Sequence, residues 1–590
     1  MKKLLILIIF LGSLSINAQN YRAIHLGGNW GYNYNNITEP DTAYFPEDFI
    51  EWLHSINVEW VGLSVSLHVE NSLDSTVELS YEAAIPTFTD ERLLATIQWL
   101  EDNGFKTYVT LAFESLEAAD SEFPVQRWQL GDPKMPNEDS NIQLENWPWA
   151  INHPDHDQFV QSFFRSYAIC AKHIASICEI GNVEIFSLGT ETERLFRTRS
   201  GGYWDNHYLS GLLEITDSVR SVFSGLLTYD MTFDAVSDAI DFYGPGSNHL
   251  WEDLNLDIVG LSAYFSLIDE LPDSVLQVDF LIEQWQNIFN EYLIPLKNNN
   301  INLPILFLEY GYTNSIASPY WAASDEFTIH EFTDINNNTK DDGEEVQANI
   351  YNAFFSTLND NPCIVEGAFL WGNEVMDSNQ YNNDWNTMVH FGIRNKLVEE
   401  EVNYLYHLNI NNPLPLKPSF ILGDTLVNQN TSTQYMINSM ENTLLYKWDL
   451  LPQDAGNIIE DDTTVIIEWS ETYTGMAKVF VFGQNYCGQG ESSDTLQIRV
   501  DDNSQIDNIS QTCSVNIFPN PCDEIINIEF DNILIENIKL EIISIDGQII
   551  YNTNLINSIS KINIGNIKGI YFIRLSSSKG LIHIEKLVKY

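Results

Sequence analysis

The sequence is poor in basic residues, in cysteine and in long apolar runs, and each shortage excludes a class of protein. Lysine and arginine number 28 against 83 aspartates and glutamates, which gives a formal net charge of −55. Nucleic acid and anionic membranes repel such a chain, so we expect neither as a partner. Six cysteines in 590 residues are too few for a disulfide scaffold, and no Cys/His spacing resembles a zinc site. After the N-terminus, no run approaches the roughly 20 apolar residues of a membrane span.

The N-terminus has the features of an export signal. Lys2 and Lys3 precede an apolar run from Leu4 to Leu11, and small residues follow up to Ala18. A basic start, a short apolar segment and a small-residue exit are typical of a secretory signal peptide. We therefore predict a signal peptide over residues 1–18 and a mature protein that is secreted or held at the outer cell surface.

From residue 21 to about residue 410, short apolar runs of β type alternate with amphipathic helical stretches. Eight strand–helix units of this kind fit a (β/α)8 TIM barrel with long loops. A doubly wound sheet is the alternative, but it usually has a glycine-rich phosphate loop after its first strand, and none is present. The predicted strands are Ala23–Leu26, Trp60–Leu67, Thr107–Ala112, Val183–Leu188, Leu226–Tyr229, Asp257–Tyr264, Ile305–Leu308 and Ala368–Trp371.

The character of the sequence changes near residue 410. A proline-rich linker over 411–418 leads to short alternating runs without helices, which predict a small all-β sandwich over residues 419–501. A second linker then precedes a last all-β sandwich over residues 513–590. In that module, Asp546 and Gly547 favour a tight hairpin turn. The predicted order is signal peptide, barrel domain over 21–410 and two small β domains.

Two glutamates stand where predicted barrel strands end. Glu191 comes after the run Val183–Leu188 and its break at Gly189, and Glu309 follows Ile305–Leu308. Barrels of this class carry their chemistry at the C-terminal ends of their strands. Hydrolysis of a glycosidic bond needs one carboxylic acid to protonate the leaving oxygen and a second carboxylate to attack or to activate water. We therefore predict that Glu191 and Glu309 are a catalytic pair, with Glu193 as a rival for the acid role.

The segments around these glutamates resemble the retaining clan of (β/α)8 glycoside hydrolases, and most closely glycoside hydrolase family 113. The segments that carry this resemblance are Ser187–Glu191, Asp257–Tyr264, Phe307–Tyr312 and Gly367–Trp371. The resemblance implies a retaining enzyme that needs no cofactor and cleaves a β-linked plant or algal polysaccharide, β-1,4-mannan first. It implies that Glu191 is the acid/base and Glu309 the nucleophile. It also implies that Tyr264 touches Glu309 and that Trp371 forms the floor of the sugar site.

Other strand-end and loop residues are candidates for contacts with substrate. They are Asn29, Trp30, His68, Trp251 and Tyr312. A lone histidine such as His25 or His249 is expected to be a packing or capping residue. Thr190 stands where much of the clan has an asparagine that binds a sugar hydroxyl.

One acidic stretch matches a calcium loop. Its oxygen-bearing side chains fall at loop positions one, three, five, nine and twelve, and they belong to Asp334, Asn336, Asn338, Asp342 and Glu345. Position six, where glycine is usual, is Thr339. A solvated acidic loop is the alternative interpretation.

The last two modules resemble accessory domains of exported proteins. Tyr446–Leu450 and Asn485–Gly488 resemble PKD-like folds that are common in secreted proteins of Bacteroidetes. Ile517–Pro521, Gly569–Arg574 and Lys586–Lys589 resemble the type IX secretion C-terminal sorting domain. This resemblance implies the type IX secretion machinery as a partner. The alternative to an enzyme is a non-catalytic surface protein that binds polysaccharide or acts as an adhesin.

Overall fold

The computed structural model separates the chain into two compact units, Met1–Asn412 and Pro413–Tyr590, which are considered one at a time. The structure describes residues 21–26, 45–71, 74–83, 85–116, 127, 130–131, 148–150, 153–192, 195, 208–233, 250–300, 302–324, 328–407, 414–502, 515–530, 538–545, 547–555, 559–563, 565, 568–577 and 580–589.

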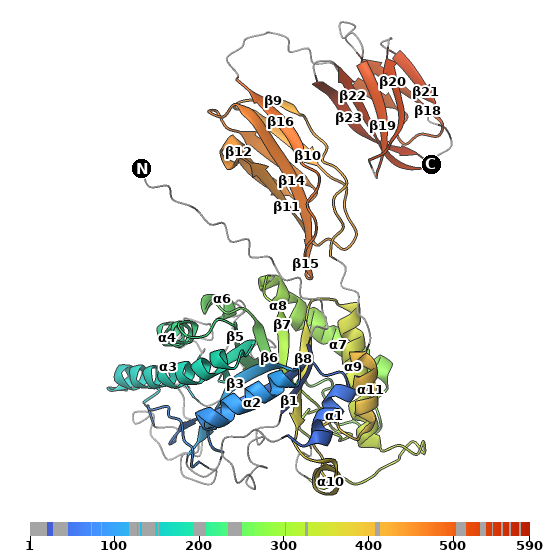
Figure 1. The fold of residues 1–590 in the computed structure, drawn as a ribbon. Helices are drawn as coiled ribbons and strands as arrows, with labels where there is room; N and C mark the ends of the chain where they lie inside the picture. Colours follow the sequence, from blue (N-terminus) through green and yellow to red (C-terminus); the bar gives the residue numbers. More distant parts are fainter. Residues whose placement is uncertain are drawn as a thin grey trace. The chain divides into compact units, whose positions relative to one another are not determined.

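The first unit is built on a closed barrel of eight parallel strands, paired in chain order from β1 to β8 and back to β1 (Figure 1). The predicted barrel is therefore confirmed. The strands are β1 (Tyr21–Leu26), β2 (Trp60–Val69), β3 (Lys106–Ser115), β4 (Ile185–Thr190), β5 (Leu226–Thr232), β6 (Val259–Ser262), β7 (Ile305–Tyr310) and β8 (Gly367–Asn373).

Helices lie outside the barrel strands (Figure 1). They are α1 (Glu47–Ser55), α2 (Asp90–Asp102), α3 (His156–Ile180), α4 (Leu209–Arg220), α6 (Leu250–Asp253), α7 (Val278–Ile288), α8 (Ile294–Asn299), α9 (Asp342–Asp360), α10 (Ser378–Gln380) and α11 (Leu397–Tyr406). Two π-helical turns, η5 (Phe289–Leu293) and η6 (Tyr381–Trp385), follow α7 and α10. Because α7, η5 and α8 follow one another directly, a π turn interrupts the helical stretch between β6 and β7.

The starts of two helices follow from side chains that satisfy free backbone N–H groups. The Thr89 hydroxyl accepts a hydrogen bond from the Arg92 N–H at 3.3 Å before α2. The Asp341 carboxylate accepts one from the Glu344 N–H at 3.0 Å before α9. Such caps satisfy donors that have no partner within the helix, and they fix where each helix begins.

Large apolar side chains fill the barrel near the N-terminal ends of its strands. Tyr21, Trp60 and Leu306 sit near the starts of their strands and belong to one buried cluster. The remaining members are Ala23, Tyr108, Ile185, Ile258, Leu308 and Phe369. Apolar side chains of this cluster thus fill the barrel toward the starts of its strands.

The second unit contains two pairs of sheets, and its all-β nature is as predicted. The first pair has strand orders β10-β13-β12 and β11-β14-β16-β9, and the second has β17-β18-β21 and β20-β19-β22-β23. The strands are β9 (Leu426–Asn428), β10 (Ser432–Met436), β11 (Leu445–Leu451), β12 (Gly456–Asp461), β13 (Thr464–Trp469), β14 (Gly475–Asn485), β15 (Gly488–Gln489), β16 (Leu496–Asp501), β17 (Val515–Phe518), β18 (Ile525–Phe530), β19 (Ile538–Ser544), β20 (Ile549–Leu555), β21 (Ile559–Asn563), β22 (Gly569–Ser577) and β23 (Gly580–Lys589), with the short 3-10 turn η7 (Gln453–Ala455) before β12.

The predicted hairpin turn joins β19 to β20, which pair antiparallel. Gly547 has φ +82° in this turn, a conformation that glycine adopts without strain. Across the described part of the chain, no helix is both long enough and apolar enough to cross a membrane.

Candidate active site

Glu191 lies directly after β4, where the strand pairing becomes irregular. The pairing with β5 shifts between Ser187 and Thr190, and Glu191 has φ +51°. Its N–H donates to the Asp230 carbonyl at 2.9 Å. A left-handed backbone is strained for glutamate, and strain of this kind persists only where the surrounding structure enforces it. The end of β4 therefore sets the direction in which the Glu191 side chain leaves the strand.

Gly189 allows the barrel wall to pack tightly just before Glu191. A Cβ atom at this position would lie 2.6 Å from the Tyr167 hydroxyl oxygen and 2.7 Å from that of Tyr229. Real Cβ atoms do not approach other atoms so closely, so only glycine fits here without a shift of both rings. The motif Gly189-Thr190-Glu191 thus reflects packing as well as chemistry.

Glu309 lies inside β7, one residue before its end, and its side chain is almost completely buried. The Tyr264 hydroxyl donates to Glu309 Oε2 at 2.9 Å, which is the contact that the family resemblance implies. Burial and the charge of Glu191 raise the pKa of Glu309 to about 8, while Arg127 and the Tyr264 hydroxyl act in the opposite direction. The two glutamates are therefore coupled, and they share one electrostatic environment.

Arg127 is a site residue that the sequence analysis missed. Its Nε and Nη2 atoms lie 2.8 and 2.7 Å from Glu191 Oε2. Although burial lowers the pKa of Arg127, the charges of Glu191 and Glu309 raise it above its ordinary value. One guanidinium thus contacts the first glutamate and stabilises negative charge on the second.

Asp230, on β5, is a second missed residue, and it lies beside both glutamates. Its Oδ2 accepts hydrogen bonds from the hydroxyls of Thr190 at 3.1 Å and Ser262 at 3.2 Å. Burial, followed by the charges of Glu309 and Glu191, raises the pKa of Asp230 well above its ordinary range. Burial and the two neighbouring glutamates therefore both disfavour the charged form of Asp230. The Thr190 hydroxyl is thus engaged in its hydrogen bond to Asp230.

Trp371 is part of β8, and its ring is half-buried. It packs edge to face against His25, with ring centroids 4.7 Å apart. His25 Nδ1 lies 3.1 Å from the Leu308 carbonyl, and the Ser64 hydroxyl lies 3.2 Å from Nε2. Burial lowers the pKa of His25 to about 3, so His25 is neutral. It is a packing residue, and it ties the Trp371 ring to the strand that carries Glu309.

Three predicted substrate contacts have buried positions, and we revise their roles. His68, Trp251 and Tyr312 are all fully buried. His68 Nε2 lies 2.8 Å from the Ile85 carbonyl, Trp251 Nε1 donates to the Tyr229 carbonyl at 3.1 Å, and the Tyr312 hydroxyl donates to the Phe265 carbonyl at 2.6 Å. Because each polar atom already has a protein partner and no side chain reaches solvent, these positions favour roles in packing.

Of the residues that the sequence analysis considers for the site, four lie outside the described residues, as does the predicted signal peptide. The four residues are Asn29, Trp30, Glu193 and His249.

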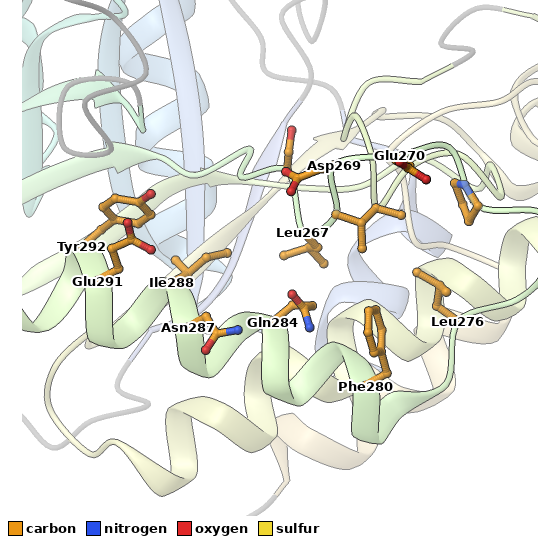
Figure 2. A pocket seen from close by; sticks show the side chains of 13 residues that line it. Leu267, Asp269, Glu270, Leu276, Phe280, Gln284, Asn287, Ile288, Glu291 and Tyr292 are labelled. Atoms are coloured by element: carbon orange, nitrogen blue, oxygen red, sulfur yellow. The ribbon is translucent and has the colours of Figure 1, made fainter.

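A pocket of about 660 Å³ opens between the segment after β6 and the outer face of α7 and η5 (Figure 2). Its lining includes neither Glu191 nor Glu309. The lining residues are Ser266, Leu267, Ile268, Asp269, Glu270, Pro272, Leu276, Phe280, Gln284, Asn287, Ile288, Glu291 and Tyr292. The pocket is therefore separate from the glutamate pair.

Family models match three consecutive parts of the chain. Residues 141–393 match Glycoside Hydrolase Family 113, residues 414–498 match a PKD-like domain, and residues 516–590 match a secretion system C-terminal sorting domain. The chain is therefore a glycoside hydrolase, and its sorting domain directs it to the cell surface or the extracellular space. More particularly, the family 113 model matches residues 141–393 of the barrel unit, so the predicted resemblances are confirmed.

The solved structures that match this chain have low sequence identity to it. A family 113 β-1,4-mannanase has 15% identity and a TM-score of 0.44, with 66% of this chain and 99% of that chain covered. The β-mannanase AaManA from Alicyclobacillus acidocaldarius has 16% identity and a TM-score of 0.43, with 65% and 96% covered. A family 5 mannosidase from Rhizomucor miehei has 9% identity and a TM-score of 0.39, with 65% and 92% covered. No curated protein matches the chain.

Proposed function

We propose that the protein is a secreted retaining glycoside hydrolase that cleaves a β-linked polysaccharide, with β-1,4-mannan as its first candidate substrate. The observation that carries the proposal is the position of the two glutamates, Glu191 directly after β4 and Glu309 near the end of β7, at the C-terminal ends of strands of one closed barrel. The family match over residues 141–393 supports the reaction class. The barrel domain over 21–410 would act on the polymer, and the module over 513–590 would engage the type IX secretion machinery after removal of the signal peptide over 1–18.

In the proposed reaction, Glu309 attacks the anomeric carbon and forms a covalent glycosyl–enzyme intermediate. Glu191 donates a proton to the leaving oxygen and later removes one from the water that hydrolyses the intermediate. The bond that Tyr264 donates to Glu309 would orient the attacking carboxylate. The ring of Trp371 would provide an apolar floor for the sugar. Two carboxylates supply all the proton transfer and nucleophilic chemistry of this double displacement, so we propose no cofactor for it.

The charge on Glu309 in the free site differs from the charge that the reaction needs. Arg127 Nη2 lies 2.7 Å from Glu191 Oε2, and burial keeps Glu309 protonated up to about pH 8. The reaction instead needs a proton on Glu191 and a charge on Glu309. We propose that a bound sugar separates Arg127 from Glu191, after which the proton is held by Glu191 and the guanidinium stabilises the Glu309 carboxylate.

Replacement of Arg127 by alanine should therefore move the acidic limb of the pH–kcat/KM profile to higher pH. The positive charge of Arg127 lowers the pKa of Glu309, so its removal raises that pKa. The ionised nucleophile then forms only at higher pH, and we expect a displacement of about one pH unit. Arg127→Lys keeps the charge and should show a smaller displacement. A limb that stays in place in Arg127→Ala would contradict this role.

The proposed function is tested by incubating the mature enzyme with mannan, xylan, β-glucan and galactan, and by following the products with proton NMR. We expect reducing ends from mannan first, and newly formed ends in the β configuration before they mutarotate, because double displacement retains the configuration. Products in the α configuration would exclude the double displacement. If every polymer bound but none were cleaved, the protein would be a polysaccharide-binding protein instead.

A further inference from the structure

Two features of the barrel unit have no role in the proposed reaction so far, the acidic loop over residues 334–345 and the carboxyl group of Asp230. In the loop, both Asp334 oxygens accept backbone N–H groups of the loop itself, each at 2.9 Å. Among the described residues, no three side chains of His, Cys, Asp or Glu come together as a group that could hold a metal ion. These contacts favour the solvated acidic loop over the predicted calcium loop, and Asp230 remains.

Backbone atoms of Asp230 hold the irregular end of β4. After the pairing shift that follows Ser187, Thr190 pairs with Asp230. The Asp230 N–H donates to the Ser187 hydroxyl at 3.2 Å, and the Asp230 carbonyl accepts the Glu191 N–H at 2.9 Å. The Ser187 hydroxyl donates in turn to the Gly189 carbonyl at 2.7 Å. The backbone that leads to Glu191 is thus fixed by one residue of β5.

The carboxyl group of Asp230 adds two hydrogen bonds, both to the same oxygen. Its Oδ2 accepts the Thr190 hydroxyl at 3.1 Å and the Ser262 hydroxyl at 3.2 Å. Thr190 directly precedes Glu191, and Ser262 is the last residue of β6. All three bonded side chains are fully buried, so bulk water does not compete for these bonds. The carboxyl group therefore connects the residue before Glu191 to the end of β6.

The two glutamates depend on Asp230 to different degrees. Glu309 is part of β7, its carbonyl accepts the Ala263 N–H at 2.7 Å, and its Oε2 accepts the Tyr264 hydroxyl. None of these contacts involves Asp230. Glu191 lies beyond the end of β4 with φ +51°, and such a conformation persists only where surrounding contacts enforce it. Loss of the Asp230 side chain should therefore displace Glu191 and leave Glu309 in place.

A third carboxyl group at this position is unfavourable by itself. Burial and the charges of Glu309 and Glu191 disfavour its charged form by raising its pKa. Its Oδ1 is buried and has no hydrogen-bond partner among the described residues, which also destabilises the fold. The presence of Asp230 is explained if the two bonds that its Oδ2 accepts contribute to the geometry that the reaction needs.

We propose that Asp230 is a positioning residue for Glu191. Through the bond that its carboxyl group accepts from the Thr190 hydroxyl, Asp230 holds Glu191 at the place from which this residue protonates the leaving oxygen. The inference rests on the proposed function, in which Glu191 is the acid/base. A displacement of about 1 Å in a catalytic group can lower a rate about 10²-fold. Steps that need the acid should therefore be sensitive to Asp230, and a step that needs only the nucleophile should not.

The experiment compares two reactions of the mature enzyme, cleavage of the preferred polymer and the first turnover of a dinitrophenyl glycoside. Polymer cleavage needs the proton of Glu191, whereas release of dinitrophenol in the first turnover needs only attack by Glu309. Asp230→Ala should lower kcat on the polymer by about 10- to 100-fold and keep the first turnover within about threefold of wild type. Asp230→Asn keeps an oxygen that can accept both hydroxyls, so it should restore most of the polymer cleavage.

Thr190→Val tests the single bond, because valine is similar to threonine in shape but lacks the hydroxyl, and Asp230 stays in place. We expect kcat on the polymer to fall about tenfold, with the first turnover again unchanged. Thr228→Val is the matched control. Thr228 is buried on β5, two residues before Asp230, and its hydroxyl donates to the Ile258 carbonyl at 3.0 Å. This variant should change neither rate by more than about threefold.

Three results would overturn the positioning role. One is an Asp230→Ala variant in which both reactions slow by the same factor, because the side chain would then support the site as a whole. The others are wild-type polymer cleavage by Asp230→Ala and equal behaviour of Thr190→Val and Thr228→Val. If the wild type releases neither reducing ends nor dinitrophenol, the proposed function fails and the inference fails with it, and this result differs from the three above.

Discussion

Glu309→Gln should lower kcat on the preferred polymer by about four orders of magnitude or more, as the loss of a catalytic nucleophile does. The amide has the shape of the carboxylate but cannot attack the anomeric carbon. Its carbonyl oxygen can still accept the hydrogen bond from Tyr264, so the geometry of β7 should be kept. The measurement is the initial rate of reducing-end release, with circular dichroism to verify the fold.

The same substitution at another buried glutamate provides the control. Glu366 precedes β8 at the opposite end of the barrel, and its pKa is also raised by burial, to about 7. Glu366→Gln should leave kcat within about tenfold of wild type, because this residue is remote from the strand ends that carry the chemistry. If Glu309→Gln kept a rate similar to that of Glu366→Gln, Glu309 would not be the nucleophile.

A second readout of Glu309→Gln is its stability as a function of pH. The pKa of Glu309 is about 8 in the folded protein, above its ordinary value of 4.5. The folded state therefore holds a proton that the unfolded state has lost between these two values, so Glu309 makes the wild type less stable as pH rises through this window. Glu309→Gln removes this loss, and its Tm relative to wild type should rise from pH 4.5 to about pH 8.

The barrel and its two glutamates could be predicted because the relevant signals are local in sequence. An apolar run predicts a buried strand, and a carboxylate at the end of such a run lies at the mouth of the barrel. Asp230 carries the same signal, but the predicted fifth strand stops at Tyr229, whereas β5 extends to Thr232. Asp230 is the residue directly after Tyr229, so a predicted fifth strand that is one residue longer would include the third carboxylate of the site.

The remaining features depend on contacts that the sequence does not show. Arg127 lies 64 residues before its partner Glu191, in a stretch without periodicity, so no local pattern connects the two. His68 and Trp251 were predicted to face substrate because they lie at strand ends or in loops. The position in the chain did not reveal which way these side chains point, and both turn into the packed interior.

Glu191→Ala should show a rate loss that depends on the leaving group of the substrate. Cleavage of the polymer should fall by about 10²- to 10⁴-fold, because no acid protonates the poor leaving oxygen. A dinitrophenyl glycoside needs no such proton, so its first step should stay close to the wild-type rate. The covalent intermediate on Glu309 should then accumulate, because no base activates water. A burst of dinitrophenol followed by slow turnover is the expected observation.

Sodium azide should restore turnover of the dinitrophenyl glycoside by Glu191→Ala and give a β-glycosyl azide, because an anion attacks the intermediate without a general base. Loss of the Glu191 carboxylate leaves the Arg127 guanidinium without the partner that it contacts at 2.7 Å. This positive charge should attract azide into the space, so the rescue should weaken in the double variant Arg127→Ala/Glu191→Ala. Glu193→Ala decides between the two candidate acids. If that variant, rather than Glu191→Ala, showed the burst and the azide product, Glu193 would be the acid/base and the strained backbone at Glu191 would serve only to hold Arg127.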